Sequence, residues 1–137
     1  MEMREYLLRR KQNTEEIKDK IVKTIRNYGL NVNGRVEYNG SAISIEDDEW
    51  HVRMWLRLTW DNNANKCVIF MSNINLHNKI QRKGIFTNVI KGLKTDKYID
   101  NIVIQSVSSD AMRNWCKKHR FKPDNYGYDY FWKAQNR

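Results

Sequence analysis

Residues 81–86 read QRKGIF, so one glycine directly follows two cations. Apolar residues with helical spacing come next, over positions 85–93, and predict a helix that begins at this glycine. The first turn of a helix has unpaired N–H groups and carries about half a positive charge, so it attracts anions. Because Gly84 has no side chain, a phosphate can approach its backbone closely. The stretch predicts a phosphate-binding turn or a plain basic loop, and its pattern alone leaves both open.

Few side chains of the sequence could act as a proton donor, and each of them could instead have a purely structural role. Cys116 falls in a run with helical spacing, 109–119, and its thiol has an ordinary pKa of about 8.5. A free cysteine more often behaves as a small buried apolar residue. Tyr126, Tyr128 or Tyr130 could supply a phenol instead, although tyrosines also suit the aromatic face of a closing strand.

Candidates for a general base are fewer. His77 titrates in a suitable range, but its position after an apolar strand favours a structural role. A dense acidic run, Glu46, Asp47, Asp48 and Glu49, could bind a cationic acceptor or activate water, or could form a solvated loop. The two cysteines form no C-x-x-C pair and the three histidines no H-E-x-x-H spacing. Neither a disulfide framework nor a metal site is therefore expected.

The net charge of +9 is concentrated in the second half of the chain. Residues 79–137 hold thirteen Lys or Arg against five Asp or Glu, whereas residues 31–78 hold four against six. A basic half predicts an anionic partner, which could be a phosphorylated cofactor, a nucleic acid or an acidic protein, unless the charge serves solubility alone. Aromatic residues among these cations suit base stacking as well as a core: Trp115, His119, Phe121, Tyr126, Tyr128, Tyr130 and Trp132.

The length of 137 residues predicts one domain, residues 1–137, with a core that needs no metal or disulfide. No run of about 18 apolar residues is present, so no transmembrane span is expected. The first residues, MEMREYLLRRKQ, do not resemble a signal peptide, which predicts a cytoplasmic protein.

Local patterns predict the elements that would position these residues. Residues 4–10 could form a short first strand, and Asn13 with Glu16 has the spacing of a capping box for a helix that ends near Gly29. Asn39-Gly40 predicts a hairpin turn between short strands within 34–46. Strict alternation over 50–60 predicts the clearest strand. The remaining expected elements are a partner strand (66–77), a helix (84–94), a strand (101–107), a helix (109–119) and a closing strand (126–134).

This order predicts an α+β fold: a central, mostly antiparallel sheet with helices on both faces. The run LHNKIQRKGIF, residues 76–86, resembles the acyl-CoA-binding signature of the GNAT superfamily of N-acetyltransferases, Gln/Arg-x-x-Gly-x-Gly/Ala. Gln81 and Gly84 fill two signature positions, and Phe86 stands where the family usually has Gly or Ala. NWCKKHRF (114–121) and YDYFWKA (128–134) are similar to the family's late helix and last strand.

The resemblance implies acetyl-CoA as acyl donor. It implies that the amides of residues 82–86 hold the pyrophosphate and that the backbone of residues 74–76 binds the pantetheine arm. The implied cofactor-binding residues are Ile74, Asn75, Leu76, Gln81, Arg82, Lys83, Gly84, Ile85, Phe86 and Thr87. The family often has a tyrosine in the late helix that acts as general acid, and Cys116 stands at that position here. The implied catalytic candidates are therefore Cys116 and, as a phenol, Tyr128.

The function that the resemblance implies is transfer of an acetyl group to a primary amine. The acceptor could be a small amine, a protein lysine or N-terminus, or an amine linked to nucleic acid. The alternative is a module with the same fold that binds nucleic acid or a protein partner with weak or no catalysis. A homodimer is also possible, and the sequence does not choose among the acceptors.

Overall fold

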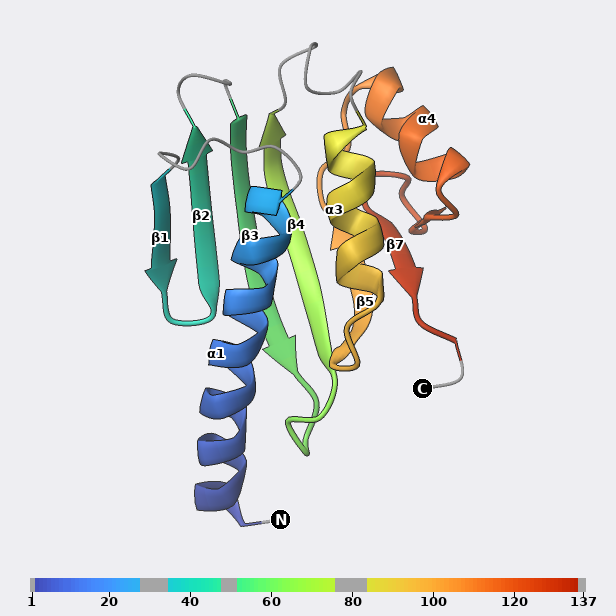
Figure 1. The fold of residues 1–137 in the computed structure, drawn as a ribbon. Helices are drawn as coiled ribbons and strands as arrows, with labels where there is room; N and C mark the ends of the chain where they lie inside the picture. The colour runs from blue at the N-terminus through green and yellow to red at the C-terminus, as the bar shows by residue number, and fades with distance from the viewer. Residues whose placement is uncertain (1, 28–34, 48–51, 76–83, 136–137) are drawn as a thin grey trace.

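The structure is a computed structural model, and it describes residues 2–27, 35–47, 52–75 and 84–135. One seven-stranded sheet organises the chain, with the strand order β1-β2-β3-β4-β5-β7-β6 (Figure 1). The helices are α1 (Met3–Asn27), α3 (Ile85–Lys94) and α4 (Asp110–Lys118). The strands are β1 (Arg35–Asn39), β2 (Ala42–Asp47), β3 (Val52–Trp60), β4 (Cys67–Asn75), β5 (Ile99–Ile104), β6 (Lys122–Pro123) and β7 (Tyr130–Lys133).

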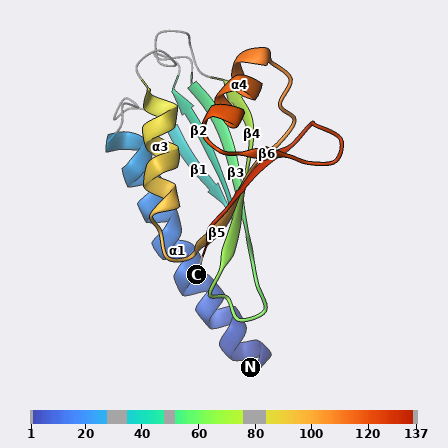
Figure 2. The same cartoon turned by 90° about the vertical axis from the view of Figure 1, so that its right-hand side faces the viewer.

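Neighbouring strands are antiparallel throughout, except for the parallel pair β4 and β5. A parallel pair needs a crossover, and α3 supplies it. Figure 2 shows α1 and α3 on one side of the sheet, and α4 lies near the end where β4 stops, in contact with α3 through Phe86 and Trp115. The predicted α+β class with a mostly antiparallel sheet is therefore confirmed.

The core lies between the sheet and the layer formed by α1 and α3. The alternation predicted for β3 is borne out, since Met54, Leu56 and Leu58 are buried while Arg53 and Arg57 are exposed. The hairpin predicted at Asn39-Gly40 joins β1 and β2, and Gly40 takes the left-handed φ of 59° that this turn requires.

The first predicted strand is wrong, because residues 4–10 belong to α1. Asn13 does not cap a helix but lies inside one, where its Nδ2 donates to the Ala64 carbonyl at 2.6 Å. Residues 4–10 are too few to distinguish the period of a helix from the alternation of a strand. Asn13 has helical conformation, and its side chain donates a hydrogen bond to a loop carbonyl. The predicted stop at Gly29 lies outside the described residues.

Two further boundaries differ from the prediction. β5 ends at Ile104 rather than 107, because Ser106 adopts a left-handed φ of 55° that breaks the extended chain. The closing strand is shorter than 126–134, because Asp124 organises residues 124–129 into a turn before β7 begins. Within the described ranges no helix is long and apolar enough to cross a bilayer.

A glycine allows α1 and α3 to pack closely. A Cβ added at Gly92 would lie 2.7 Å from Cγ2 of Thr24, which is shorter than a van der Waals contact. The Thr24 side chain is stiff at χ1, and its hydroxyl donates to the Lys20 carbonyl at 2.8 Å, so it does not move aside easily. The contact therefore requires glycine at position 92.

We expect Gly92→Ala to lower the free energy of unfolding by about 1 kcal/mol, because an overpacking cost of roughly 1–3 kcal/mol exceeds a helix-propensity gain of about 1 kcal/mol. In a Thr24→Ser background, which removes Cγ2 and keeps the hydroxyl, the same change should stabilise instead. Urea denaturation of the four proteins measures both effects. Equal effects of Gly92→Ala in the two backgrounds would contradict the close contact.

Candidate active site

The strands β4 and β5 stop pairing after Met71. Their register runs from Cys67 with Ile99 to Met71 with Ile104, and the Gln105 N–H then donates to the Met71 carbonyl at 2.8 Å. β4 continues alone beside β3 to Asn75, whereas the chain after Gln105 turns toward α4. The backbone edge of β4 that faces β5 is therefore open beyond Met71, among the residues that the structure describes.

A bulge in β4 lies close to the point where β4 and β5 stop pairing. Trp55 lies opposite Ser72 and Arg53 lies opposite Asn75, so β4 has one more residue than β3 between these pairs. A bulge bends its strand and increases the local twist. The bulge lies directly after Met71, so the bend falls where β4 and β5 stop pairing.

A cavity of about 660 Å³ lies where β4 and β5 stop pairing. Its walls come from the end of β4, the first turn of α3, the segment after β5 and the face of α4 that carries Ala111, Met112 and Trp115. The lining residues are Ser72, Ile74, Phe86, Thr87, Ile104, Gln105, Ser106, Val107, Ser108, Ser109, Ala111, Met112 and Trp115. The lining thus combines apolar side chains with hydroxyl and amide groups, a mixture that is usual in ligand pockets.

The amino end of α3 meets this cavity. Gly84 precedes the helix with a left-handed φ of 70°, and no side chain of the described residues caps the helix. The first bond of the helix runs from the Asn88 N–H to the Gly84 carbonyl at 3.0 Å, so the N–H groups of residues 85–87 have no partner within the helix. No acidic residue lies in the first turn, and the end of the helix is therefore suited to an anion.

Phe86 and Trp115 form the wall between α3 and α4. Phe86 is only 5% exposed, and its ring centroid lies 4.6 Å from that of Trp115. Trp115 Nε1 donates to Thr87 Oγ1 at 2.9 Å. The bulky residue at position 86 is therefore accommodated by an aromatic contact with α4, while its backbone remains part of the first helical turn.

The segment after β5 was missed by sequence reasoning. Ser106, in left-handed conformation, donates its N–H to Asp129 Oδ1 at 2.9 Å, and the Val107 N–H donates to the Tyr128 carbonyl at 2.7 Å. Ser109 caps α4, where its side chain accepts from the Met112 N–H at 3.1 Å. The small polar run SVSSD was the available signal, because such residues favour turns and helix starts.

The predicted cofactor-binding residues are partly brought together. Ile74, Phe86 and Thr87 line the cavity, and the backbone of Gly84 and Ile85 forms the start of α3. Asn75 is the last residue of β4. Leu76, Gln81, Arg82 and Lys83 lie outside the described residues, as does His77.

The two predicted catalytic side chains do not line the cavity. Cys116 is 0% exposed, and burial raises the pKa of its thiol to about 12. This placement favours the interpretation of Cys116 as a small apolar core residue. Tyr128 is 67% exposed, and it reaches the cavity wall through its backbone carbonyl rather than its ring. Tyr126 is also exposed, whereas Tyr130 is buried in the core.

The described lining offers hydrogen-bond donors but no carboxylate, imidazole, amine, thiol or phenol. This lining is suited to binding and orientation: the amino end of α3 suits an anion, the open edge of β4 suits an extended chain, and hydroxyl and amide groups suit a polar centre. Among the described residues, no group of three or more His, Cys, Asp or Glu could hold a metal ion. Of the predicted acidic run, Glu46 and Asp47 end β2, and Asp48 and Glu49 lie outside the described residues.

Comparison with known proteins gives likeness at the level of structure. No protein-family model and no curated protein matches the chain. Naa50 of Arabidopsis thaliana, in complex with the bisubstrate analogue CoA-Ac-MVNAL, is 15% identical; the match covers 84% of this chain and 88% of that chain, with a TM-score of 0.45. The N-acetyltransferase YlbP of Bacillus subtilis, in complex with coenzyme A, is 16% identical over 69% of this chain and 68% of that chain, with a TM-score of 0.44. At such low TM-scores and identities, neither structure assigns the site.

Both thiols should be inert in the folded protein. Burial raises the pKa of Cys67 and of Cys116 to about 12, so almost no thiolate exists at pH 8. We expect Ellman's reagent to label neither thiol at pH 8 under native conditions and both in guanidinium chloride. Rapid labelling of Cys116 in the folded state would contradict its burial and restore it as a candidate acid.

Proposed function

We propose that the chain is an acyl-CoA-dependent N-acyltransferase of the GNAT type, which transfers an acetyl group from acetyl-CoA to a primary amine. The observation that carries the proposal is the cavity at the point where β4 and β5 stop pairing. This cavity meets the amino end of α3. The Gly84 motif marks that helix end in the sequence. The strand order, with one parallel pair and α3 as its crossover, agrees with the fold that the motif implies.

The residues present fit the pyrophosphate and the pantetheine arm of acetyl-CoA. The N–H groups of residues 85–87 suit the pyrophosphate, because they are unpaired within the helix and lie at its positive end. The open edge of β4 beyond Met71 suits the amides of the pantetheine arm, which can pair with it as a strand would. Ile74, Val107 and Met112 provide apolar surface for the methylene groups between these amides.

The reaction requires little covalent chemistry from the protein. The amine nitrogen attacks the thioester carbonyl, the C–N bond forms, the C–S bond breaks, and coenzyme A leaves as a thiolate that takes up a proton. Fixing both reactants in one cavity supplies proximity, and the hydroxyl and amide groups of the lining can polarise the carbonyl. Because the described lining holds no titratable side chain, the amine loses its proton to water or to a group outside that lining.

Titration calorimetry of acetyl-CoA into the wild type, Gly84→Glu and Gly40→Glu tests the binding step. The two glycines are matched, since both have a left-handed φ, 70° and 59°, and neither has an atom of the described residues within 4 Å of an added Cβ. Backbone strain is therefore similar, and only Gly84→Glu places a carboxylate at α3. We expect micromolar binding by the wild type and by Gly40→Glu, and at least tenfold weaker binding by Gly84→Glu.

Equal binding by the two variants would contradict the pyrophosphate position, and no binding by the wild type would remove the acyltransferase proposal. An acceptor screen then follows the release of coenzyme A with small amines, basic peptides and RNA. Acetyl-CoA binding without transfer to any amine would support a module that kept the fold and lost catalysis.

A further inference from the structure

A group of exposed cations surrounds the carboxyl ends of α3 and α4. We define the α4 basic surface as Lys91, Lys117, Lys118, Arg120 and Lys122, all of which are exposed. None of them forms an ion pair with a residue that the structure describes. The charge excess noted in the sequence is therefore displayed here rather than neutralised within the fold.

The acidic residues of this half are mostly engaged elsewhere. Asp110 pairs with Arg113 at 3.0 Å, and Asp96 pairs with Lys20 at 3.2 Å. Asp124 and Asp129 accept hydrogen bonds from backbone N–H groups. Their charges organise turns and helix contacts, so they are not arranged to neutralise the α4 basic surface.

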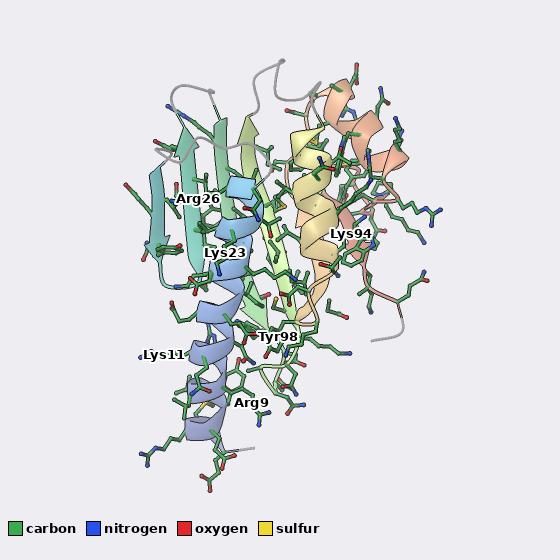
Figure 3. The ribbon with its side chains drawn as sticks, viewed as in Figure 1. Arg9, Lys11, Lys23, Arg26, Lys94 and Tyr98 are labelled. Carbon is green, nitrogen blue, oxygen red and sulfur yellow. The ribbon has the colours of Figure 1, made fainter. Side chains whose placement is uncertain are left out.

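Lys94 shows how closely the cations lie. Its Nζ donates to the His119 carbonyl at 3.4 Å and sits 5.0 Å and 5.1 Å from the ring centroids of Phe121 and Trp132. Figure 3 shows Lys94 on the side of α3 that faces α4 and β7. Burial first, and then repulsion from Arg120 and Lys91, lowers the pKa of Lys94. A bound anion would relieve this repulsion.

A hydrogen-bonded turn that follows Lys122 presents two tyrosines to solvent. Asp124 Oδ1 accepts from the N–H groups of Tyr126 at 3.2 Å and Tyr128 at 3.1 Å, and Gly127 supplies a left-handed φ of 74°. The side chains of Tyr126 and Tyr128 are 81% and 67% exposed. A turn held by its own hydrogen bonds thus displays aromatic faces that the core does not use.

We propose that the α4 basic surface and this tyrosine turn bind single-stranded nucleic acid. Proteins bind single-stranded nucleic acid through cations along its phosphate backbone and through exposed aromatic rings on which its bases stack. Compensation of the helix dipoles explains lysines in last turns, but it explains neither Arg120, Lys122 nor the exposed tyrosines. An acidic protein would use the cations but would have less use for two rings on a fixed turn.

The proposed surface adjoins the cavity. The Tyr128 carbonyl and the Asp129 carboxylate accept hydrogen bonds from Val107 and Ser106, and both of these residues line the cavity. A strand that stacks on the tyrosine turn therefore lies beside the cavity wall. Binding there does not depend on acyl transfer, so it goes beyond the proposed function.

Fluorescence anisotropy with labelled single-stranded RNA and DNA over a range of salt concentrations tests the proposal. The test variant is Lys117→Gln/Lys118→Gln/Lys122→Gln. The control is Lys11→Gln/Lys23→Gln/Arg26→Gln, which removes three exposed cations from α1, away from α4 (Figure 3). Both variants have the same net charge, so bulk charge cannot separate them. Tyr126→Ser tests stacking alone.

We expect the wild type and the control to bind with steep salt dependence. The test variant should bind at least tenfold more weakly, with a slope of log K against log salt reduced by roughly 2, since single strands contribute about 0.7 per phosphate contact. Tyr126→Ser should weaken binding by about fivefold or more. The RNA and DNA arms report which strand is preferred. Acetyl-CoA binding should be unchanged in the test variant, which separates this proposal from the previous one.

Three results would overturn the proposal: no binding of either nucleic acid by the wild type, equal weakening of the test and control variants, or displacement of RNA by polyglutamate of matched charge. The last result would assign the surface to an acidic protein instead.

Discussion

The structure depends on how far β4 can pair with two neighbours at once. It pairs with β3 along its whole length but with β5 only as far as Met71, because it gains a residue relative to β3 and the chain after Gln105 turns away. A central strand normally has both backbone edges satisfied, so an open edge next to a cavity is an unusual feature of a core strand. The cavity lies where β4 and β5 have separated, and α3 and α4 form its remaining walls.

The contact between α3 and α4 holds the cavity open at a defined width. Phe86 packs on Trp115, and Trp115 also donates a hydrogen bond to Thr87, so two adjacent residues of the first turn of α3 are tied to α4. This explains how a phenylalanine takes a position where a small residue is usual in the signature. Its ring belongs to the wall, while the N–H groups of the same turn remain directed along the helix axis.

Much of this fold could be predicted from local pattern. The alternation of β3, the turn at Asn39-Gly40 and the helix after Gly84 depend on neighbouring residues only. The helical nature of residues 4–10 was missed because their period becomes clear only with the rest of α1. The cavity walls from Ser106 to Ser109 could not be predicted, because a left-handed serine and its bond to Asp129 depend on a turn more than twenty residues away. Cys116 was assigned by alignment to a motif, and only the packed structure shows that its side chain faces the core.

The central claim is that acyl-CoA binds along the open edge of β4 and at the amino end of α3. Amide hydrogen exchange with and without saturating coenzyme A tests it most directly, because the claim concerns backbone N–H groups. It predicts slower exchange in residues 72–75 and 85–87 and no change in the hairpin of β1 and β2. Protection confined to other segments, or none at saturation, would contradict it.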